Sequence, residues 1–233
     1  MQRQHRCRLL LPALGSLLAV LLGPLTSGDA RASAELFGTR QVYFADLDPF
    51  TKWNEVVART EHQIADPREL CPNGLTDRGC VLARWRAFVA AMSRLPLAER
   101  VARVNSALNG VRYVPTAVNW HDGDHWETPF EFLEYGGQCE DFAIAKLVAL
   151  SQTGVAERDL RLVVVWDEVK RLPHAVAVVY VDGKALVLDN QIKEVMPDTE
   201  IGRYVPYYAI NRQGWWLSVA ADGAPPVRRE VSP

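Results

Sequence analysis

The sequence predicts an α+β fold, with helices in the first half of the chain and an antiparallel sheet in the second. Apolar residues recur at helical spacing between residues 50 and 108. Runs rich in β-branched residues follow between residues 162 and 188, and Asp182-Gly183 separates two of them. The composition, 48% hydrophobic and 23% charged, is that of a globular domain, so a disordered or fibrous chain is excluded.

Three amphipathic helices are expected, over Phe50–Ile64, Val81–Leu95 and Leu97–Leu108. Periodicity is lost from Asn109 to Gly137, so this segment is expected to be a long irregular connection. A fourth, largely buried helix should cover Phe142–Leu150 and end near Gly154.

Three strands are expected, over Leu162–Trp166, Ala175–Val181 and Ala185–Leu188. The Asp-Gly pair predicts a two-residue turn between the last two. We find no internal repeat. We therefore expect one folded domain over residues 35–220, followed by a flexible tail at residues 221–233.

The first 34 residues have the pattern of an export signal. Arginines precede an apolar stretch over residues 9–25, and Ala32-Ser33-Ala34 is a small-residue cleavage pattern, with cleavage after Ala30 as the alternative. An uncleaved anchor in the inner membrane is the other interpretation, because 17 apolar residues are near the shortest length that spans a bilayer. Removing four Arg and one Asp changes the net charge from −2 to −5. We expect a mildly acidic periplasmic protein that does not bind nucleic acid.

Export changes the meaning of the four cysteines. Cys71 and Cys80 flank a turn-rich segment and favour a disulfide, with a zinc pair as the alternative. Cys7 lies within the expected signal. Cys139 is then either a small core residue or a reactive thiol.

The predicted hairpin brings a histidine and an acid together. If Asp182 and Gly183 are the two turn residues, Val176 faces Asp189, and His174 and Asp189 are diagonal neighbours on one face of the sheet. Cys139 follows two glycines and begins the buried helix, where free N–H groups favour a thiolate. Cysteine, histidine and aspartate in these positions indicate a nucleophile, its base and an orienting acid.

Four segments of the chain resemble the bacterial transglutaminase-like cysteine proteinases, in particular their LapG-like periplasmic members. These are Asp124-His125-Trp126-Glu127-Thr128-Pro129-Phe130-Glu131-Phe132-Leu133, Gly136-Gly137-Gln138-Cys139-Glu140-Asp141-Phe142-Ala143, Pro173-His174-Ala175-Val176 and Leu188-Asp189-Asn190. The resemblance extends from about Phe44 to Gln213. It implies a papain-like fold and a Cys139–His174–Asp189 triad. For LapG-like members it also implies cleavage of the N-terminal region of a surface adhesin and control by an inner-membrane receptor.

Residues beside the cysteine suggest a calcium site that departs from the family pattern. LapG-like members have an acidic residue immediately before the cysteine, where this chain has Gln138. Glu140 and Asp141 remain candidate calcium ligands, although one charge fewer should weaken the site. Alternatively, the two acids only complement the positive end of the helix.

The transition state of acyl transfer also needs hydrogen-bond donors for its oxyanion. The backbone N–H of Cys139 is one candidate, and the side chains of Gln138 and Trp126 are two others. The sequence as a whole predicts an exported cysteine endopeptidase that requires no cofactor for its chemistry. A transglutaminase or amidase with the same triad, or an inactive binding module, are the alternatives.

Overall fold

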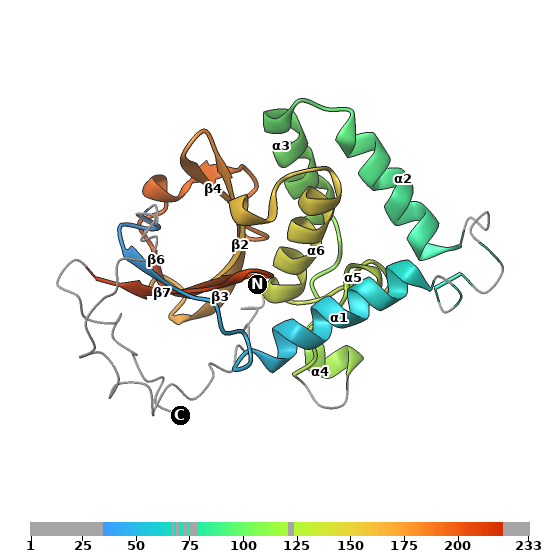
Figure 1. Cartoon of the computed structure of the whole chain (residues 1–233), viewed down its shortest axis with the longest axis horizontal. Helices are drawn as coiled ribbons and strands as arrows, with labels where there is room; N and C mark the ends of the chain where they lie inside the picture. Colours follow the sequence, from blue (N-terminus) through green and yellow to red (C-terminus); the bar gives the residue numbers. More distant parts are fainter. Residues whose placement is uncertain are drawn as a thin grey trace.

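The computed structural model describes residues 35–66, 68, 70, 71, 74, 79–120 and 124–220. The expected export signal and the expected C-terminal tail lie outside the described residues. A curved sheet occupies one side of the molecule and helices the other, with α6 between them (Figure 1). The helices are α1 (Thr51–Ala65), α2 (Val81–Ser93), α3 (Leu97–Leu108), α4 (Thr116–Asn119), α5 (Pro129–Tyr135) and α6 (Cys139–Gln152), with 3₁₀ turns η1 (Glu157–Asp159) and η2 (Asp198–Glu200).

The sheet has seven antiparallel strands in the order β1-β7-β6-β2-β3-β4-β5. They are β1 (Arg40–Phe44), β2 (Leu160–Asp167), β3 (Leu172–Val181), β4 (Lys184–Leu188), β5 (Met196–Pro197), β6 (Tyr204–Asn211) and β7 (Gly214–Val219). The α+β class is confirmed, and β2, β3 and β4 confirm the three expected strands.

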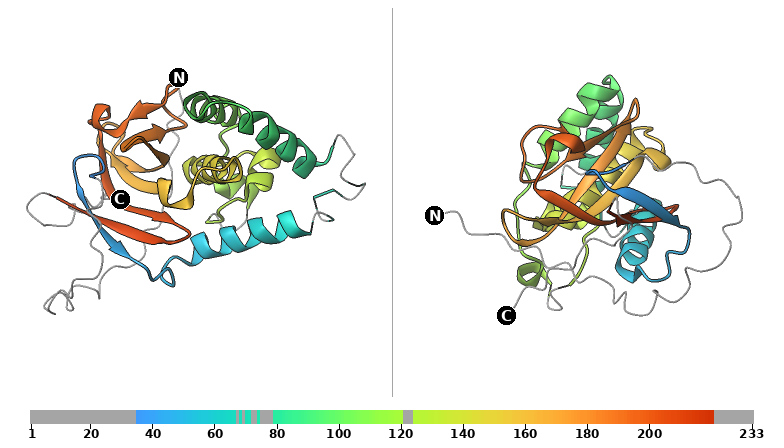
Figure 2. Two further views of the ribbon diagram at one scale, coloured as in Figure 1. Left: turned by 45° about the horizontal axis from the view of Figure 1, so that its top comes forward. Right: turned by 90° about the vertical axis from the view of Figure 1, so that its left-hand side faces the viewer.

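The first strand of the chain pairs with the last. Strand β1 lies antiparallel to β7, with Val42 opposite Leu217, and the two ribbons run side by side in Figure 2. The prediction that helices precede all strands is therefore wrong for β1. The sequence analysis also missed β5, β6 and β7. A five-residue edge strand gains its hydrogen bonds from a partner about 175 residues away, so no local pattern specifies it.

Helices α1, α2 and α3 confirm the three expected amphipathic helices, and α6 extends the fourth to Cys139–Gln152. The expected irregular connection over residues 109–137 is wrong in part, because it contains α4 and α5. Helix α5 is stabilised by a capping box. Thr128 Oγ1 accepts from the Glu131 N–H at 3.3 Å, and a Glu131 carboxylate oxygen accepts from the Thr128 N–H at 2.8 Å. Pro129, at the first helical position, further favours this start.

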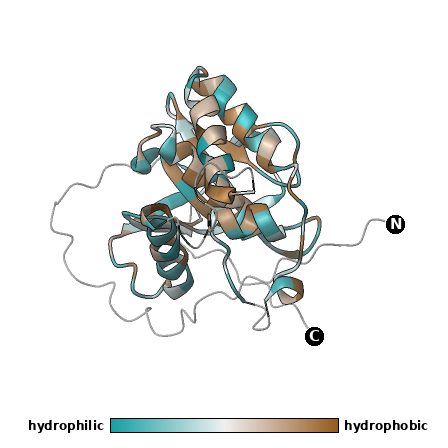
Figure 3. Cartoon of the chain, turned by 90° about the vertical axis from the view of Figure 1, so that its right-hand side faces the viewer, coloured by the Kyte–Doolittle hydropathy of each residue, from teal (hydrophilic) through white to brown (hydrophobic). Residues whose placement is uncertain are grey.

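Two apolar clusters lie on opposite faces of the central strands. The larger one packs α6 against β2 and β3 and includes Ala175, Ala177 and Val179 of β3. The smaller one takes the alternate residues of β3, Val176 and Val178. Figure 3 shows hydrophobic and hydrophilic residues alternating along the helices, as expected of helices with one buried face. Burial on both faces explains why residues 162–166 of β2 and the middle of β3 are continuously apolar.

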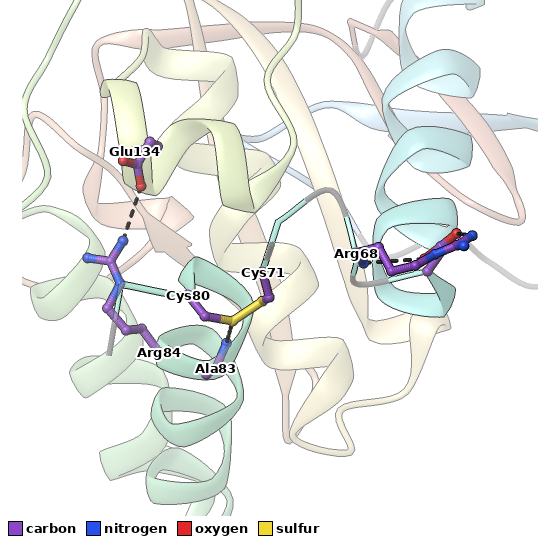
Figure 4. The surroundings of a disulfide bond; sticks show 7 residues. Arg68, Cys71, Cys80, Ala83, Arg84 and Glu134 are labelled. Atoms are coloured by element: carbon purple, nitrogen blue, oxygen red, sulfur yellow. Dashed lines mark hydrogen bonds and ion pairs between the residues drawn. A yellow bond between two sulfur atoms is a disulfide. The ribbon is translucent and has the colours of Figure 1, made fainter. Parts of the chain in front are cut away.

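A disulfide joins Cys71 to Cys80 directly before α2 (Figure 4). This is the pairing that the spacing favoured, and it excludes the zinc alternative because both sulfur atoms are used. Cys80 is also the N-cap of α2, and its sulfur accepts from the Ala83 N–H at 3.1 Å. Within the part of the chain that the structure describes, no helix is long and apolar enough to cross a membrane.

Candidate active site

Cys139 is the first residue of α6 and is buried. Two glycines bring the chain to this position. Gly136 has a φ of 77°, and a Cβ there would lie 2.5 Å from the carbonyl oxygen of Arg112. A Cβ on Gly137 would lie 2.6 Å from a carboxylate oxygen of Asp141. The Gly-Gly pair before the cysteine is thus a steric requirement for the approach to the helix.

Asp141 fixes the start of α6. Its Oδ2 accepts from the Gln138 N–H at 2.7 Å, and its Oδ1 accepts from the Glu127 N–H at 2.8 Å. Asp141 is fully buried, and burial together with the charges of Glu140 and Glu127 raises its pKa. The aspartate therefore ties the helix to the segment that precedes α5.

Two further buried carboxyl groups, those of Glu140 and Glu127, belong to the same acidic cluster as Asp141. Glu140 Oε2 is 3.2 Å from the Cys139 sulfur. Burial raises the pKa of Glu140 to about 7, and the charges of Asp124 and Glu127 act in the same direction. Burial also raises the pKa of Glu127, whose Oε1 accepts from Trp120 Nε1 at 2.8 Å. The nucleophile candidate thus stands beside a cluster of acids with a reduced tendency to ionise.

The β3–β4 hairpin has the register that the sequence predicted. Val181 pairs with Lys184 and Ala177 with Leu188, which leaves Val176 opposite Asp189. Asp182 and Gly183 both have positive φ, as a two-residue turn of this kind requires. His174 Nε2 lies 2.8 Å from Asp189 Oδ1, and both side chains are at most 1% exposed. The predicted histidine–aspartate pair is present and shielded from water.

Asp189 has three further partners that the sequence analysis did not identify. Its Oδ2 accepts from the Tyr204 hydroxyl at 2.5 Å, its Oδ1 accepts from the Gln191 N–H at 2.8 Å, and Arg203 Nη2 lies 3.9 Å from Oδ2. Burial alone would raise the pKa of Asp189, but His174, Tyr204 and the Gln191 N–H outweigh it and lower the pKa to about 2. Asp189 therefore remains ionised at neutral pH. Tyr204 could not be found from a local pattern, because it comes from β6, a strand that the sequence did not predict.

Helix α6 packs along β3, so Cys139 and His174 come from adjoining elements. Their side chains nevertheless have different surroundings. Cys139 belongs to the larger apolar cluster, whereas the His174 ring lies 5.7 Å from that of Tyr204, a member of the smaller cluster. The second ring nitrogen of His174, Nδ1, is 3.1 Å from the side-chain nitrogen of Gln191. Direct contact between Cys139 and His174 stays a prediction.

Of the two side chains expected to bind an oxyanion, Gln138 is hydrogen-bonded within the protein and Trp126 is buried in the larger cluster. Gln138 Nε2 donates to Thr116 Oγ1 and, at 3.2 Å, to Glu140 Oε1, so an oxyanion would have to displace one of these acceptors. Trp126 packs in the larger cluster, and its carbonyl oxygen accepts from Arg59. The backbone N–H of Cys139 at the helix start remains the better-placed candidate donor.

A cysteine at the start of a buried helix, together with strands that carry a histidine–aspartate pair, is typical of papain-like thiol hydrolases. Residues 76–224 match the family described as bacterial transglutaminase-like cysteine proteinase, BTLCP. The chain therefore belongs to this family of cysteine proteinases.

Solved structures agree with this assignment. LapG of Legionella pneumophila is 26% identical over 69% of this chain and 88% of its own, with a TM-score of 0.57. A calcium-bound structure of the same protein is 22% identical over 77% of this chain and 93% of its own, with a TM-score of 0.55. No curated protein matches the sequence.

Proposed function

We propose that this chain is an exported endopeptidase in which Cys139 attacks a peptide carbonyl, His174 is its base and Asp189 orients the imidazole. The observation that carries the proposal is the buried 2.8 Å contact between His174 Nε2 and Asp189 Oδ1, in the register expected from the hairpin. An ionised aspartate at Nε2 keeps the proton on that nitrogen, which leaves the lone pair on Nδ1.

The reaction then has two stages. His174 Nδ1 takes the proton of the Cys139 thiol, and the sulfur attacks the carbonyl carbon of the substrate. The C–N bond breaks, the leaving amine takes the proton from Nδ1, and a thioester remains on Cys139. Water then loses a proton to Nδ1 and attacks the thioester, which releases the acid and regenerates the thiol. The positive end of α6 and the Cys139 N–H stabilise the oxyanion in both stages.

The substrate that we propose is the N-terminal region of a surface adhesin, cleaved in the periplasm under the control of an inner-membrane receptor. Support comes from the four motifs shared with LapG-like proteinases, from the family match and from the likeness to LapG. The pattern of residues 1–34 supports export to that compartment.

Of the acids beside the start of α6, Asp141 and Glu140 already have hydrogen-bond partners, whereas Glu127 Oε2 is buried and has no hydrogen bond within the part of the chain that the structure describes. Asp141 uses both carboxylate oxygens for backbone N–H groups, and the amide nitrogen of Gln138 donates to Glu140. Among the described residues, no group of three or more His, Cys, Asp or Glu side chains could hold a metal ion. The mechanism that we propose includes no step through calcium, and Gln138 in place of an acid should weaken a calcium site here.

The test is cleavage by the purified protein under reducing conditions. It is incubated with exported proteins from the same cell, with the adhesin N-terminal region as the defined substrate, and fragments are identified by mass spectrometry. We expect fragments with the wild type and the His62→Gln control, and none with Cys139→Ala or His174→Gln, because His62 lies on α1 away from the site. A chelator should not abolish cleavage.

Other outcomes would contradict the proposal. Fragments that still form with Cys139→Ala would exclude the proposed nucleophile. Transfer of the acyl group to an added amine, without hydrolysis, would identify a transglutaminase. A biological effect that survives Cys139→Ala, without any cleavage, would indicate a binding module.

A further inference from the structure

The imidazole nitrogen that has to accept the thiol proton already has a partner. His174 Nδ1 lies 3.1 Å from Gln191 Nε2, and Gln191 Oε1 accepts from Lys170 Nζ. Lys170 lies in the turn between β2 and β3, and Gln191 follows β4. The three side chains thus form a chain from the surface to the buried His174–Asp189 pair.

The chemistry of these groups fixes the direction of each hydrogen bond. A lysine ammonium can only donate, so the atom of Gln191 that faces Lys170 must be its oxygen. The amide nitrogen of Gln191 then faces His174, and because an amide NH₂ can only donate, Nδ1 must be the acceptor. Nε2 therefore carries the ring proton and donates it to Asp189, so His174 is held as a neutral base.

We propose that Gln191 is a further residue of the catalytic site, whose side-chain amide covers the base nitrogen of His174 at rest and has to leave before Cys139 can be deprotonated. The inference rests on the proposed function. Once Nδ1 carries a proton, Nδ1 and the Gln191 amide are both donors and no hydrogen bond between them is possible. The covered arrangement and the working arrangement of His174 therefore exclude each other.

The side chain of Gln191 can move while the pair beneath it stays in place. Its backbone N–H donates to Asp189 Oδ1 at 2.8 Å, which anchors the main chain. Its side chain is only partly buried and Lys170 is exposed, whereas His174 is 0% exposed. Rotation of the amide thus breaks its contacts with His174 and Lys170 and leaves the His174–Asp189 hydrogen bond intact.

The covered arrangement, in which the Gln191 amide lies over His174 Nδ1, should lower the reactivity of the Cys139 thiol by a modest factor. The amide is held over Nδ1 by one neutral hydrogen bond and by an exposed contact with Lys170. The covered arrangement should therefore be favoured over the uncovered one by about threefold to tenfold. Removing the amide should raise the reactivity of the Cys139 thiol by the same factor.

The test uses two variants of the whole protein, each with a matched control. Gln191→Ala removes the cover and Lys170→Ala removes its support. Gln213→Ala makes the same change at an exposed position in the β6–β7 turn, and Lys184→Ala does so at the exposed first residue of β4. The first measurement is the ¹⁵N spectrum of the His174 imidazole. The second is the rate at which iodoacetamide alkylates Cys139 after reduction, at one fixed pH.

We expect the wild type to show the Nε2–H form with Nδ1 as an acceptor. In Gln191→Ala the Nδ1 signal should move toward that of an imidazole nitrogen without a hydrogen bond. Alkylation of Cys139 should become about threefold to tenfold faster, with a smaller rise in Lys170→Ala and none in either control.

Each of three results would overturn the inference. The first is an Nδ1 signal that is the same in the wild type and in Gln191→Ala, and the second is an unchanged rate of Cys139 alkylation in Gln191→Ala. The third is a slower rate of alkylation in that variant, which would show that the amide assists the site. If the spectral change and the faster alkylation are both present but no Cys139-dependent proteolysis is found, the proteolytic assignment is wrong. The contact between Gln191 and His174 is then still established.

Discussion

Tyr204→Phe is the sharpest test of how the site keeps its acid ionised. The change removes only a hydroxyl, which donates to Asp189 Oδ2 at 2.5 Å and accepts from Arg203 Nη2 at 2.8 Å. Asp189 is 1% exposed, so water cannot replace the lost donor. The aspartate would keep only the donors at its Oδ1 and the more distant charge of Arg203.

The size of the effect follows from the pKa of Asp189. Its fall from the ordinary value of 3.8 to about 2 corresponds to a net stabilisation of about 2 kcal/mol, which is what its partners contribute beyond the opposing effect of burial. A hydrogen bond to a charged group contributes about 1.5–3 kcal/mol, so Tyr204→Phe should reduce the free energy of unfolding by about 1.5–2.5 kcal/mol at pH 7. Because the pKa is lowered in the folded state, this stabilisation is complete above pH 3.8 and is lost as the pH falls through 2.

The assay is urea denaturation at pH 7 and pH 3, together with kcat/KM on a cleaved substrate. Tyr180→Phe is the matched control, since its buried hydroxyl has no hydrogen-bond partner in the described part of the chain. It should change the free energy of unfolding by less than about 0.5 kcal/mol. Tyr204→Phe should lose less stability at pH 3 than at pH 7.

Equal free energies of unfolding for the two phenylalanine variants at pH 7 would refute the reasoning. A loss in Tyr204→Phe that is as large at pH 3 as at pH 7 would show that the hydroxyl acts through packing and not through the charge of Asp189.

Three other substitutions test the surroundings of the cysteine and of Asp189. Glu140→Gln should flatten the pH dependence of Tm. Because the pKa of Glu140 is raised to about 7 in the folded state, its contribution to wild-type stability is greatest below pH 4.5 and is lost as the pH rises through 7. Thermal melting in the presence of a chelator at pH 5 and pH 8 measures this difference. Lys146→Met should remove a rise in stability with pH. Burial lowers the pKa of Lys146 from 10.5 to about 7, so its contribution to the free energy of unfolding increases as the pH rises between those values. Urea denaturation of both proteins at pH 7 and pH 9.5 measures this effect. Gly136→Ala should prevent folding or cost several kcal/mol of stability, since the new Cβ would clash with its surroundings and the backbone has a positive φ. The control Gly154→Ala has a φ of 95° but open space around it, so it should cost only about 1–2 kcal/mol. Similar Tm values for the two variants in thermal melting would contradict the steric argument.

Local patterns specified the elements that carry the proposed triad. Asp182-Gly183 favours a two-residue turn with positive φ at both positions, and such a turn fixes every pair outward along β3 and β4. The contact between His174 and Asp189 could therefore be predicted by counting residues. The start of α6 was equally local, because Gly136 permits a backbone that other residues avoid.

The partners of the pair could not be predicted in the same way. Tyr204 and Arg203 reach Asp189 only because β6 lies beside β2, an order of strands that no short pattern encodes. The position of Lys170 beside Gln191 likewise depends on the β2–β3 turn meeting the segment that follows β4.

By itself, then, the sequence determined the α+β class, the hairpin register and the identity of the three candidate catalytic residues, because turn chemistry and side-chain periodicity act over a few residues. Only the tertiary structure decided which groups surround them: the hydroxyl that helps to keep Asp189 charged, the amide over His174 and the acids beside Cys139. Each of these depends on burial and on contacts between distant segments, and those exist only once the chain has packed.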